Sequence, residues 1–306
     1  MKVIVTGGAG FIGSHIVDIL IKAEHQVAII DNLSTGNKYN LNPKASFYEA
    51  DIRDLESVRK IFAKEQPDVL NHQAAHAIVN ASIINPGYDA QVNIIGSINL
   101  LQSCKEFEVK KVIFASSGGA IYGQPETNLC KEDHPIQPLS PYGAAKAAIE
   151  IYAKVFYQTY GIKYIGLRYG NVFGPRQDPY GEAGVVAIFI QKMLKNQSCT
   201  IYGSGEQERD FVFVEDIAKA SLLSLNSYAS GYYNIGTGLG TNVNDIFSKL
   251  KQLTHYSKMA IYEHEREGEV FKIALDATQA FKTIGWKKET TIEEGLRATV
   301  EYMQTH

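Results

Sequence analysis

Residues 6–13 read TGGAGFIG, and this stretch decides the fold. It lies between a β-branched run that predicts a buried strand and an amphipathic run that predicts a helix, which is the setting of a dinucleotide-binding turn. Gly7 permits a tight turn, Gly10 lets the backbone approach a pyrophosphate, and Gly13 lets the helix lie close to the strand. The N-terminus of the helix then offers unpaired N–H groups to phosphate oxygens.

An acidic residue at the end of the next strand favours this interpretation over a purely structural turn. Asp31 follows Gly13 by eighteen residues. This is close to the spacing of about 20 at which a carboxylate binds the hydroxyls of an adenosine ribose. A carboxylate there repels a 2′-phosphate, and residues 32–36 contain no arginine, so the sequence favours NAD over NADP. Asp51, after the third strand, is expected either to contact the adenine or to cap the helix that follows.

Short apolar runs alternate with longer amphipathic stretches through the first half of the chain. This rhythm predicts an α/β fold with a doubly wound parallel sheet that is covered by helices on both faces. Glycine and proline cluster after residue 168. We therefore expect a nucleotide-binding domain at 1–170 and a smaller α/β substrate lobe at 171–306, with some segments returning to the sheet. The expected strands are 2–6, 26–30, 45–50, 68–71, 111–115 and 163–168, and the expected helices are 11–23, 55–65, 93–106, 141–160, 185–194 and 291–302.

The composition excludes several other classes of protein. The chain has 306 residues, of which 45% are hydrophobic and 21% charged, as is typical of a globular protein with a sizeable core. The net charge of −3 gives no basic footprint for nucleic acid or an anionic membrane surface. No apolar run approaches the ~18 residues of a membrane span, and the start predicts no signal peptide. Three scattered cysteines predict reduced thiols and a cytoplasmic protein.

A tyrosine and a lysine lie four residues apart in the expected helix at 141–160. Tyr142 and Lys146 therefore share one face of that helix. A phenol has a pKa of about 10, and an ammonium about 5 Å away favours its ionisation by roughly 3 kcal/mol, which makes the tyrosine a candidate general base. Ser116 and Ser117 follow the fifth strand at its carboxyl end, where ligands of such sheets bind. We expect Ser117 to hold the reacting oxygen, and Ser116 is the alternative for this role unless it is a turn or capping residue.

Two further interpretations are weaker. His72 and His76 are four residues apart, as in a metal-binding HExxH helix, but the glutamate is missing and the segment follows a strand, so we expect no metal site. A non-catalytic nucleotide-binding protein would not need the combination of Ser117, Tyr142 and Lys146.

Taken together, the motifs resemble those of the extended short-chain dehydrogenase/reductases, and within them the UDP-glucose 4-epimerases and related NAD-dependent sugar-nucleotide epimerases. The resemblance implies a Rossmann domain with bound NAD, a carboxyl-terminal lobe that binds a UDP-sugar, and a homodimer formed through the helices at roughly 89–106 and 142–159. The motifs that carry it are TGGAGFIG (6–13), DNLSTG (31–36), FASSGGAIYG (114–123), YGAAK (142–146), LRYGNVFGPRQ (167–177) and RDFVFVEDIA (209–218).

The resemblance also implies roles for residues of the substrate side. Ser117, Tyr142 and Lys146 match the catalytic set. Asn171 matches a residue near the substrate diphosphate. Arg209 and Arg266 match arginines that hold the UDP phosphates, with a surface ion pair as the alternative for each. The expected cofactor contacts are Gly7, Gly10, Phe11, Ile12, Gly13, Asp31, Asn32, Ser34, Gly36, Asp51, Ile52, Ala74, Ala75, Asn93, Tyr142, Lys146, Tyr169 and Val172.

Three positions bear on the choice of reaction and sugar. Gly118 stands where many epimerases have a third Ser or Thr, and Ala77 where UDP-galactose epimerases often have a lysine. Related dehydratases and decarboxylases carry acids in the serine segment, which this chain lacks, so an epimerase is favoured. The resemblance places Ile273 beside the C2 substituent of the sugar. UDP-glucose or UDP-galactose is the first expectation, followed by UDP-N-acetylhexosamine and UDP-uronic acid.

Overall fold

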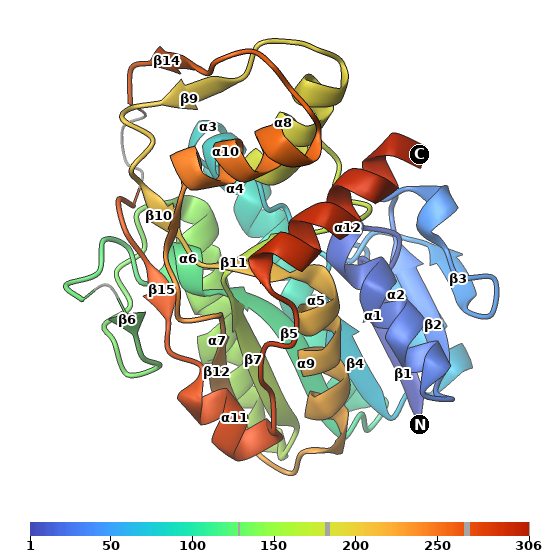
Figure 1. Ribbon diagram of the computed structural model, residues 1–306. Coiled ribbons are helices and arrows are strands. Elements are labelled where there is room, and N and C mark those ends of the chain that lie inside the picture. The colour runs from blue at the N-terminus through green and yellow to red at the C-terminus, as the bar shows by residue number, and fades with distance from the viewer. Residues whose placement is uncertain (128, 181–183, 266–269, 306) are drawn as a thin grey trace.

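In the computed structural model, which describes residues 1–127, 129–180, 184–265 and 270–305, a seven-stranded sheet forms the centre of the molecule (Figure 1). The strands run parallel in the order β12-β7-β5-β4-β1-β2-β3, which confirms the predicted doubly wound α/β fold. Their bounds are β1 (Lys2–Thr6), β2 (Gln26–Asp31), β3 (Ser46–Glu49), β4 (Val69–His72), β5 (Lys111–Ser117), β7 (Lys163–Tyr169) and β12 (Gly231–Ile235).

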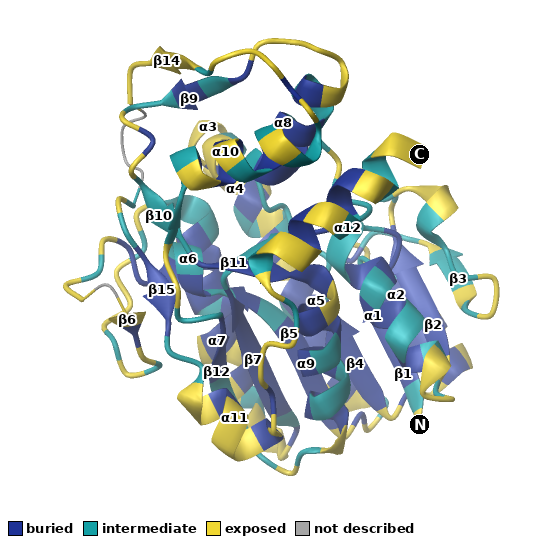
Figure 2. Cartoon of the chain, in the orientation of Figure 1, coloured by how far each residue is buried: buried dark blue, intermediate teal, exposed yellow. Residues whose placement is uncertain are grey.

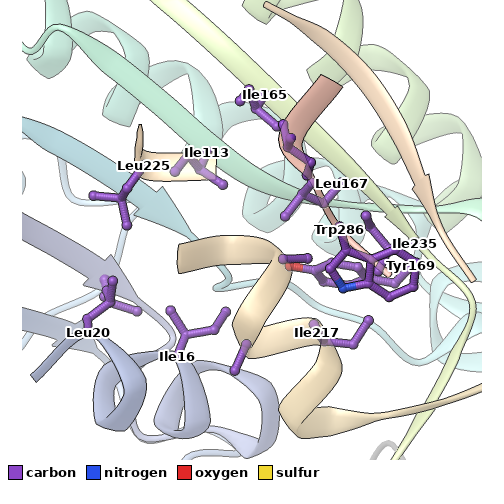
Figure 3. Close-up of a cluster of buried hydrophobic side chains, with 14 of the residues drawn as sticks. Ile16, Leu20, Ile113, Ile165, Leu167, Tyr169, Ile217, Leu225, Ile235 and Trp286 are labelled. Carbon is purple, nitrogen blue, oxygen red and sulfur yellow. The ribbon is translucent and has the colours of Figure 1, made fainter. Parts of the chain in front are cut away.

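Side chains alternate along β1 and so supply both hydrophobic layers. Val3 and Val5 belong to the layer that contains Ile217 and Trp286, whereas Ile4 belongs to the layer that contains Phe62. Figure 2 shows the inner strands of the sheet as mostly buried and the edge strand β3 as intermediate to exposed, and Figure 3 shows part of the first layer. The helices that supply residues to the first layer are α1 (Phe11–Lys22), α9 (Val214–Asn226) and α11 (Thr278–Ile284), and those of the second are α2 (Leu55–Glu65), α5 (Gly96–Glu106) and α7 (Pro141–Tyr160).

A smaller lobe lies beyond the end of the sheet opposite the N-terminus (Figure 1). Its core includes Phe173, Phe189, Phe213, Phe247 and Leu296. Its elements are β8 (Asn171–Phe173), α8 (Val185–Leu194), β9 (Thr200–Tyr202), β10 (Glu208–Arg209), β11 (Phe211–Phe213), β13 (Thr241–Asn242), α10 (Val243–Leu253), β14 (Ile261–Glu263) and α12 (Ile292–Thr305). At one side β6 (Leu129–Cys130) pairs with β15 (Ala274–Leu275).

Most predicted elements are confirmed, but the segment between β4 and β5 differs. It contains two short helices that were not predicted, and the expected helix at 93–106 begins later because a π-helical turn precedes it. The additional short elements of the first half are η1 (Lys38–Asn40), α3 (Val79–Ile84), α4 (Pro86–Ala90), η2 (Gln91–Ile95) and α6 (Gly118–Ile121). Among the described residues, no helix combines the length and hydropathy that crossing a membrane requires.

Candidate active site

A cleft of about 2130 Å³ lies at the carboxyl ends of the parallel strands, where β1, β2, β4, β5 and β7 all end. Residues of the smaller lobe also line it, so the cleft borders both parts of the molecule. Most of the site residues predicted from the sequence meet there: Gly7, Gly10, Phe11, Ile12, Gly13, Asp31, Asn32, Ser34, Gly36, Asp51, Ile52, Ala74, Ala75, Ser117, Tyr142, Lys146, Tyr169, Asn171, Val172 and Arg209.

The glycine turn after β1 is closed tightly on its inner side. Gly7 has a φ of +70°, and a Cβ there would lie 2.7 Å from Ala74 N. A Cβ on Gly13 would lie 2.0 Å from the carbonyl oxygen of Gly7, so no side chain fits between turn and helix. Gly10 precedes α1 without a side-chain cap, and the first turn of α1 holds no acidic residue. The helix N-terminus therefore presents its N–H groups to the cleft, as a pyrophosphate requires.

Asp31 joins this turn to the loop that follows β2. Its carboxylate accepts hydrogen bonds from Ala9 N at 3.0 Å and from Leu33 N at 2.8 Å. Burial raises the pKa of Asp31, while these two backbone donors act to lower it. A Cβ on Gly36 would lie 2.7 Å from Asp31 Oδ1, so the loop can approach the carboxylate only as glycine. Each carboxylate oxygen keeps a lone pair for a ribose hydroxyl.

Asp51 lies at the same end of the cleft but does not cap α2. Its carboxylate binds the guanidinium of Arg53 and the amide of Asn32. The hydrogen bond from Arg53 is the main reason why the pKa of Asp51 falls to about 2, and burial opposes this effect. The N-cap of α2 is Asp54, which accepts from Glu56 N and Ser57 N. The capping alternative for Asp51 is therefore wrong.

Tyr142 and Lys146 occupy the first turns of α7, which begins at a serine cap and a proline. Ser140 Oγ accepts from Gly143 N at 3.1 Å, and the backbone N–H of Tyr142 donates to Ser82 Oγ at 3.2 Å. Lys146 is 3% exposed. Its ammonium donates to the carbonyl of Ala115 at 3.0 Å and lies 5.7 Å from the centre of the Tyr142 ring. Both side chains line the cleft, as their helical spacing predicts.

Both serines at the end of β5 have atoms at the cleft, but their hydroxyls differ in their contacts. Ser117 lines the cleft, and its side chain makes no capping hydrogen bond to α6. Ser116 is buried, and its hydroxyl donates to Glu150 Oε1 at 2.7 Å. The expectation that Ser116 is a turn or capping residue is therefore wrong, because its hydroxyl binds a buried carboxylate.

Gly118 is glycine for a reason of packing. A Cβ at this position would lie 2.5 Å from Leu275 Cδ1. A serine or threonine at Gly118 would therefore require the buried side chain of Leu275 to move, which accounts physically for this departure from the epimerase pattern.

Asn93 does not belong to the cleft lining among the described residues. It is fully buried, and its side-chain amide bonds both the N–H and the carbonyl of His76. The same amide donates to Asp89 Oδ1 at 3.0 Å, and His76 Nδ1 lies 3.0 Å from that oxygen. His72 instead lies between the hydroxyls of Thr6 and Ser97. The described residues contain no group of three metal-ligating side chains.

The residues expected to bind the substrate differ in where they lie. The side-chain oxygen of Asn171 lies 3.5 Å from the position of a Cβ on Gly119. Arg209 Nη1 donates to the backbone oxygen of Glu208 at 2.9 Å. Arg266 lies outside the described residues. Ile273 is 3% exposed in a cluster with Tyr122 and does not appear in the lining, so it stands behind the wall of the cleft rather than at its surface.

Sequence reasoning missed several residues of the cleft. Gln73 follows β4 and accepts a hydrogen bond from the phenol of Tyr169 at 3.3 Å. His76 and Tyr88 also line the cleft, with their rings in edge contact. The position of Gln73 directly after a buried strand could have predicted that it lines the cleft. Tyr88 lies in a short helix, and the sequence around it has no hydrophobic periodicity that predicts this helix.

Comparisons with known proteins agree with this geometry. Residues 3–236 match the model of the NAD dependent epimerase/dehydratase family. The chain is 51% identical over 304 residues to a Methanocaldococcus jannaschii protein that carries the provisional name UDP-glucose 4-epimerase, with 99% of each chain covered. A UDP-glucose 4-epimerase of Thermotoga maritima, solved with UDP-glucose, is 48% identical with a TM-score of 0.98 and covers 100% and 99% of the two chains. That of Thermus thermophilus, solved with NAD, is 42% identical with a TM-score of 0.94 and 99% of each chain covered.

Proposed function

The chain belongs to the NAD-dependent epimerase/dehydratase family, and from this premise we propose that it inverts C4 of a UDP-hexose, interconverting UDP-glucose and UDP-galactose. The observation that carries the proposal is the meeting of Ser117, Tyr142 and Lys146 with the glycine turn in one cleft. The relatives solved with UDP-glucose and with NAD support the same reaction and the same cofactor.

The residues of the cleft fit a bound NAD. Gly10 has no Cβ to obstruct a pyrophosphate, and the N–H groups at the start of α1 point to that place. The carboxylate of Asp31 is suited to the hydroxyls of the adenosine ribose. When bound, NAD supplies a hydride acceptor for C4 of the sugar and a donor for the opposite face. The protein supplies orientation, proton transfer and electrostatics.

We infer that Tyr142 is the general base, with Ser117 as the hydroxyl that holds the O4 atom and relays its proton. Lys146 is buried and adjacent to the tyrosine ring, so its charge favours the phenolate. Asn171 and Arg209 are suited to hold the diphosphate while the sugar turns between its two faces. In this proposal residues 1–170 chiefly bind NAD, and residues 171–306 chiefly bind the UDP-sugar.

A panel of nucleotide sugars tests the proposed reaction. Purified protein is incubated separately with UDP-galactose, UDP-N-acetylglucosamine and UDP-glucuronic acid, and the anomeric proton signals are followed by NMR. We expect UDP-galactose to be converted to UDP-glucose at the highest kcat/KM. Faster conversion of the N-acetylated or uronic sugar would assign a different substrate, and no conversion of any of them would contradict the proposed epimerase.

We also propose that the protein is a cytoplasmic homodimer. Three free, buried cysteines are consistent with a reducing compartment. The outer faces of η2 and α7 expose Ile95, Ile151 and Val155, which form an apolar surface suited to a second copy. We expect sedimentation velocity to give a dimer and Ile151→Asp to give a monomer. A wild-type protein that remains monomeric at micromolar concentration would contradict this proposal.

A further inference from the structure

Behind the proposed base lies a buried ion pair to which the mechanism above gives no role. The side chains of Arg168 and Glu150 are only 3% and 2% exposed. Arg168 donates from Nε to Oε1 at 2.9 Å and from Nη2 to Oε2 at 2.7 Å, so it holds both oxygens of Glu150. Oε1 also accepts from Ser116, and Arg168 Nη1 donates to Tyr122 Oη at 2.9 Å. Removing two charges from water costs free energy that offsets their attraction, so a buried ion pair adds little net stability. A stabilising effect alone therefore does not explain why this pair is present.

Glu150 stands where it could compete with the phenol for the charge of Lys146. The two residues are four apart in α7, so they lie one turn from each other on the same face. They also approach neighbouring residues of β5, since Lys146 Nζ donates to Ala115 O and Glu150 Oε1 accepts from Ser116. An ammonium that met this carboxylate in a dry interior would pair with it strongly. Arg168 instead occupies both carboxylate oxygens.

Two titratable side chains of β4 and β7, among the described residues, lie near this site without charge. His72 approaches from β4, and burial, aided by the positive charge of Lys146, lowers its pKa to about 3, so it is uncharged at neutral pH. Tyr169 lines the same cleft from β7, and burial raises the pKa of its phenol. Among the described residues, the ion pair of Glu150 on α7 and Arg168 on β7 bonds to the residue of β5 next to the one that binds the ammonium.

We propose that Arg168 is a positioning residue for the reaction: by holding both oxygens of Glu150, it keeps that carboxylate from Lys146 and leaves the ammonium to act on the phenol of Tyr142. The inference rests on the proposed function, in which Tyr142 is the base. The planar fork of an arginine suits this task, because it binds both oxygens of one carboxylate, whereas a lysine offers a single point charge.

The test compares Arg168→Met with the double variant Glu150→Gln, Arg168→Met, each loaded with NAD. The pH dependence of kcat is measured with saturating UDP-galactose. In the single variant the freed Glu150 carboxylate pairs with Lys146, so the acidic limb of the profile moves to higher pH by about one unit. In the double variant no carboxylate competes for the ammonium, so the acidic limb of the profile returns to its wild-type pH. We expect this return even if the double variant is less stable than the wild type.

A purely structural role for the pair would lower stability and kcat in both variants without separating their acidic limbs. The proposal is overturned if folded Arg168→Met keeps the wild-type limb, or if the double variant is displaced as far as the single one. Should Arg168→Met fail to fold, Glu150→Gln provides the other arm of the test. Its limb is expected at the wild-type pH or below, and an upward shift would overturn the proposal.

A measurement without turnover separates this inference from the proposed function. The ionisation of the Tyr142 phenol is followed by ultraviolet difference titration, with Tyr142→Phe in each background as the blank. Absence of epimerisation by the wild-type protein would contradict the proposed reaction. The phenol titration would still test Arg168, with the same order expected: Arg168→Met ionises at higher pH than either the wild type or the double variant.

Discussion

At the scale of single residues, the proposed chemistry depends most on one phenolic oxygen. Tyr142→Phe removes the base but keeps the ring that contacts Lys146. We expect kcat to fall by about 10²–10⁴-fold, the usual contribution of a general base, while NAD remains bound. Tyr157→Phe is the matched control, because Tyr157 is an exposed tyrosine of the same helix. Steady-state rates and the NAD content of each variant provide the measurement, and an active Tyr142→Phe enzyme would reject the assignment.

We expect Asp31 to determine the choice between the two nicotinamide cofactors. Asp31→Asn removes the negative charge that favours ribose hydroxyls and repels a 2′-phosphate. We expect NAD to bind about tenfold more weakly and the preference for NAD over NADP to shrink, because hydrogen bonds to charged groups contribute about 1.5–3 kcal/mol. Titration calorimetry with both cofactors measures this ratio. Asp18→Asn on α1 is the control, and an unchanged ratio in Asp31→Asn would contradict the role of the carboxylate.

At the scale of elements, the contact between α6 and β15 restricts what can follow Ser117. In Gly118→Ser the new Cβ would overlap Leu275 Cδ1, and the shift that relieves it is expected to cost about 1–3 kcal/mol of unfolding free energy. Gly119→Ser is the matched control, since its Cβ would have an ordinary contact of 3.5 Å with Asn171. Chemical denaturation of the two variants measures the difference. Equal stability in both variants would show that the Leu275 side chain moves aside without cost.

The elements that sequence predicts well are those whose signals are local. The helix that carries Tyr142 begins at Ser140 and Pro141 and ends at a left-handed glycine, and both signals are written in the sequence. The π-helical turn at Gln91–Ile95 has no such signal, and the segment that contains it holds Asn93 away from the cleft. The role of Ser116 was equally hidden, because its partner Glu150 lies 34 residues away on another element.

At the scale of the whole molecule, the chain does not complete the sheet before it forms the smaller lobe, because later segments return to the sheet. β12 comes from residues 231–235 and still pairs with β7. The indole N–H of Trp286 donates to the backbone of Asp216 on α9 at 2.8 Å, so a late segment closes the first hydrophobic layer. Such returns depend on contacts distant in sequence, which is why alternating periodicity predicts the layers and not the path of the chain between them.

Acid is expected to destabilise the whole molecule through histidines that are buried without charge. Burial is the main cause that lowers the pKa of His72 to about 3 and that of His15 to about 4, whereas an imidazole in the unfolded chain titrates near 6.5. Between these values the unfolded chain binds more protons than the folded one, so stability is complete above pH 6.5 and is lost as the pH falls through this window. At pH 5 the loss from His72 alone is about 2 kcal/mol.

Urea denaturation of the wild type at pH 8 and pH 5 measures the total loss, and His72→Gln isolates one contribution to it. The glutamine keeps hydrogen-bonding capacity toward Thr6 and Ser97 but cannot take up a proton in this range. We therefore expect the variant to be less stable at pH 8 yet to lose about 2 kcal/mol less than the wild type between the two pH values. His255→Gln, at an exposed position, should leave the loss unchanged. If the His72→Gln protein loses as much stability as the wild type, the prediction is contradicted. The imidazole of His72 would then take up its proton in the folded wild-type protein without destabilising the sheet beside Lys146.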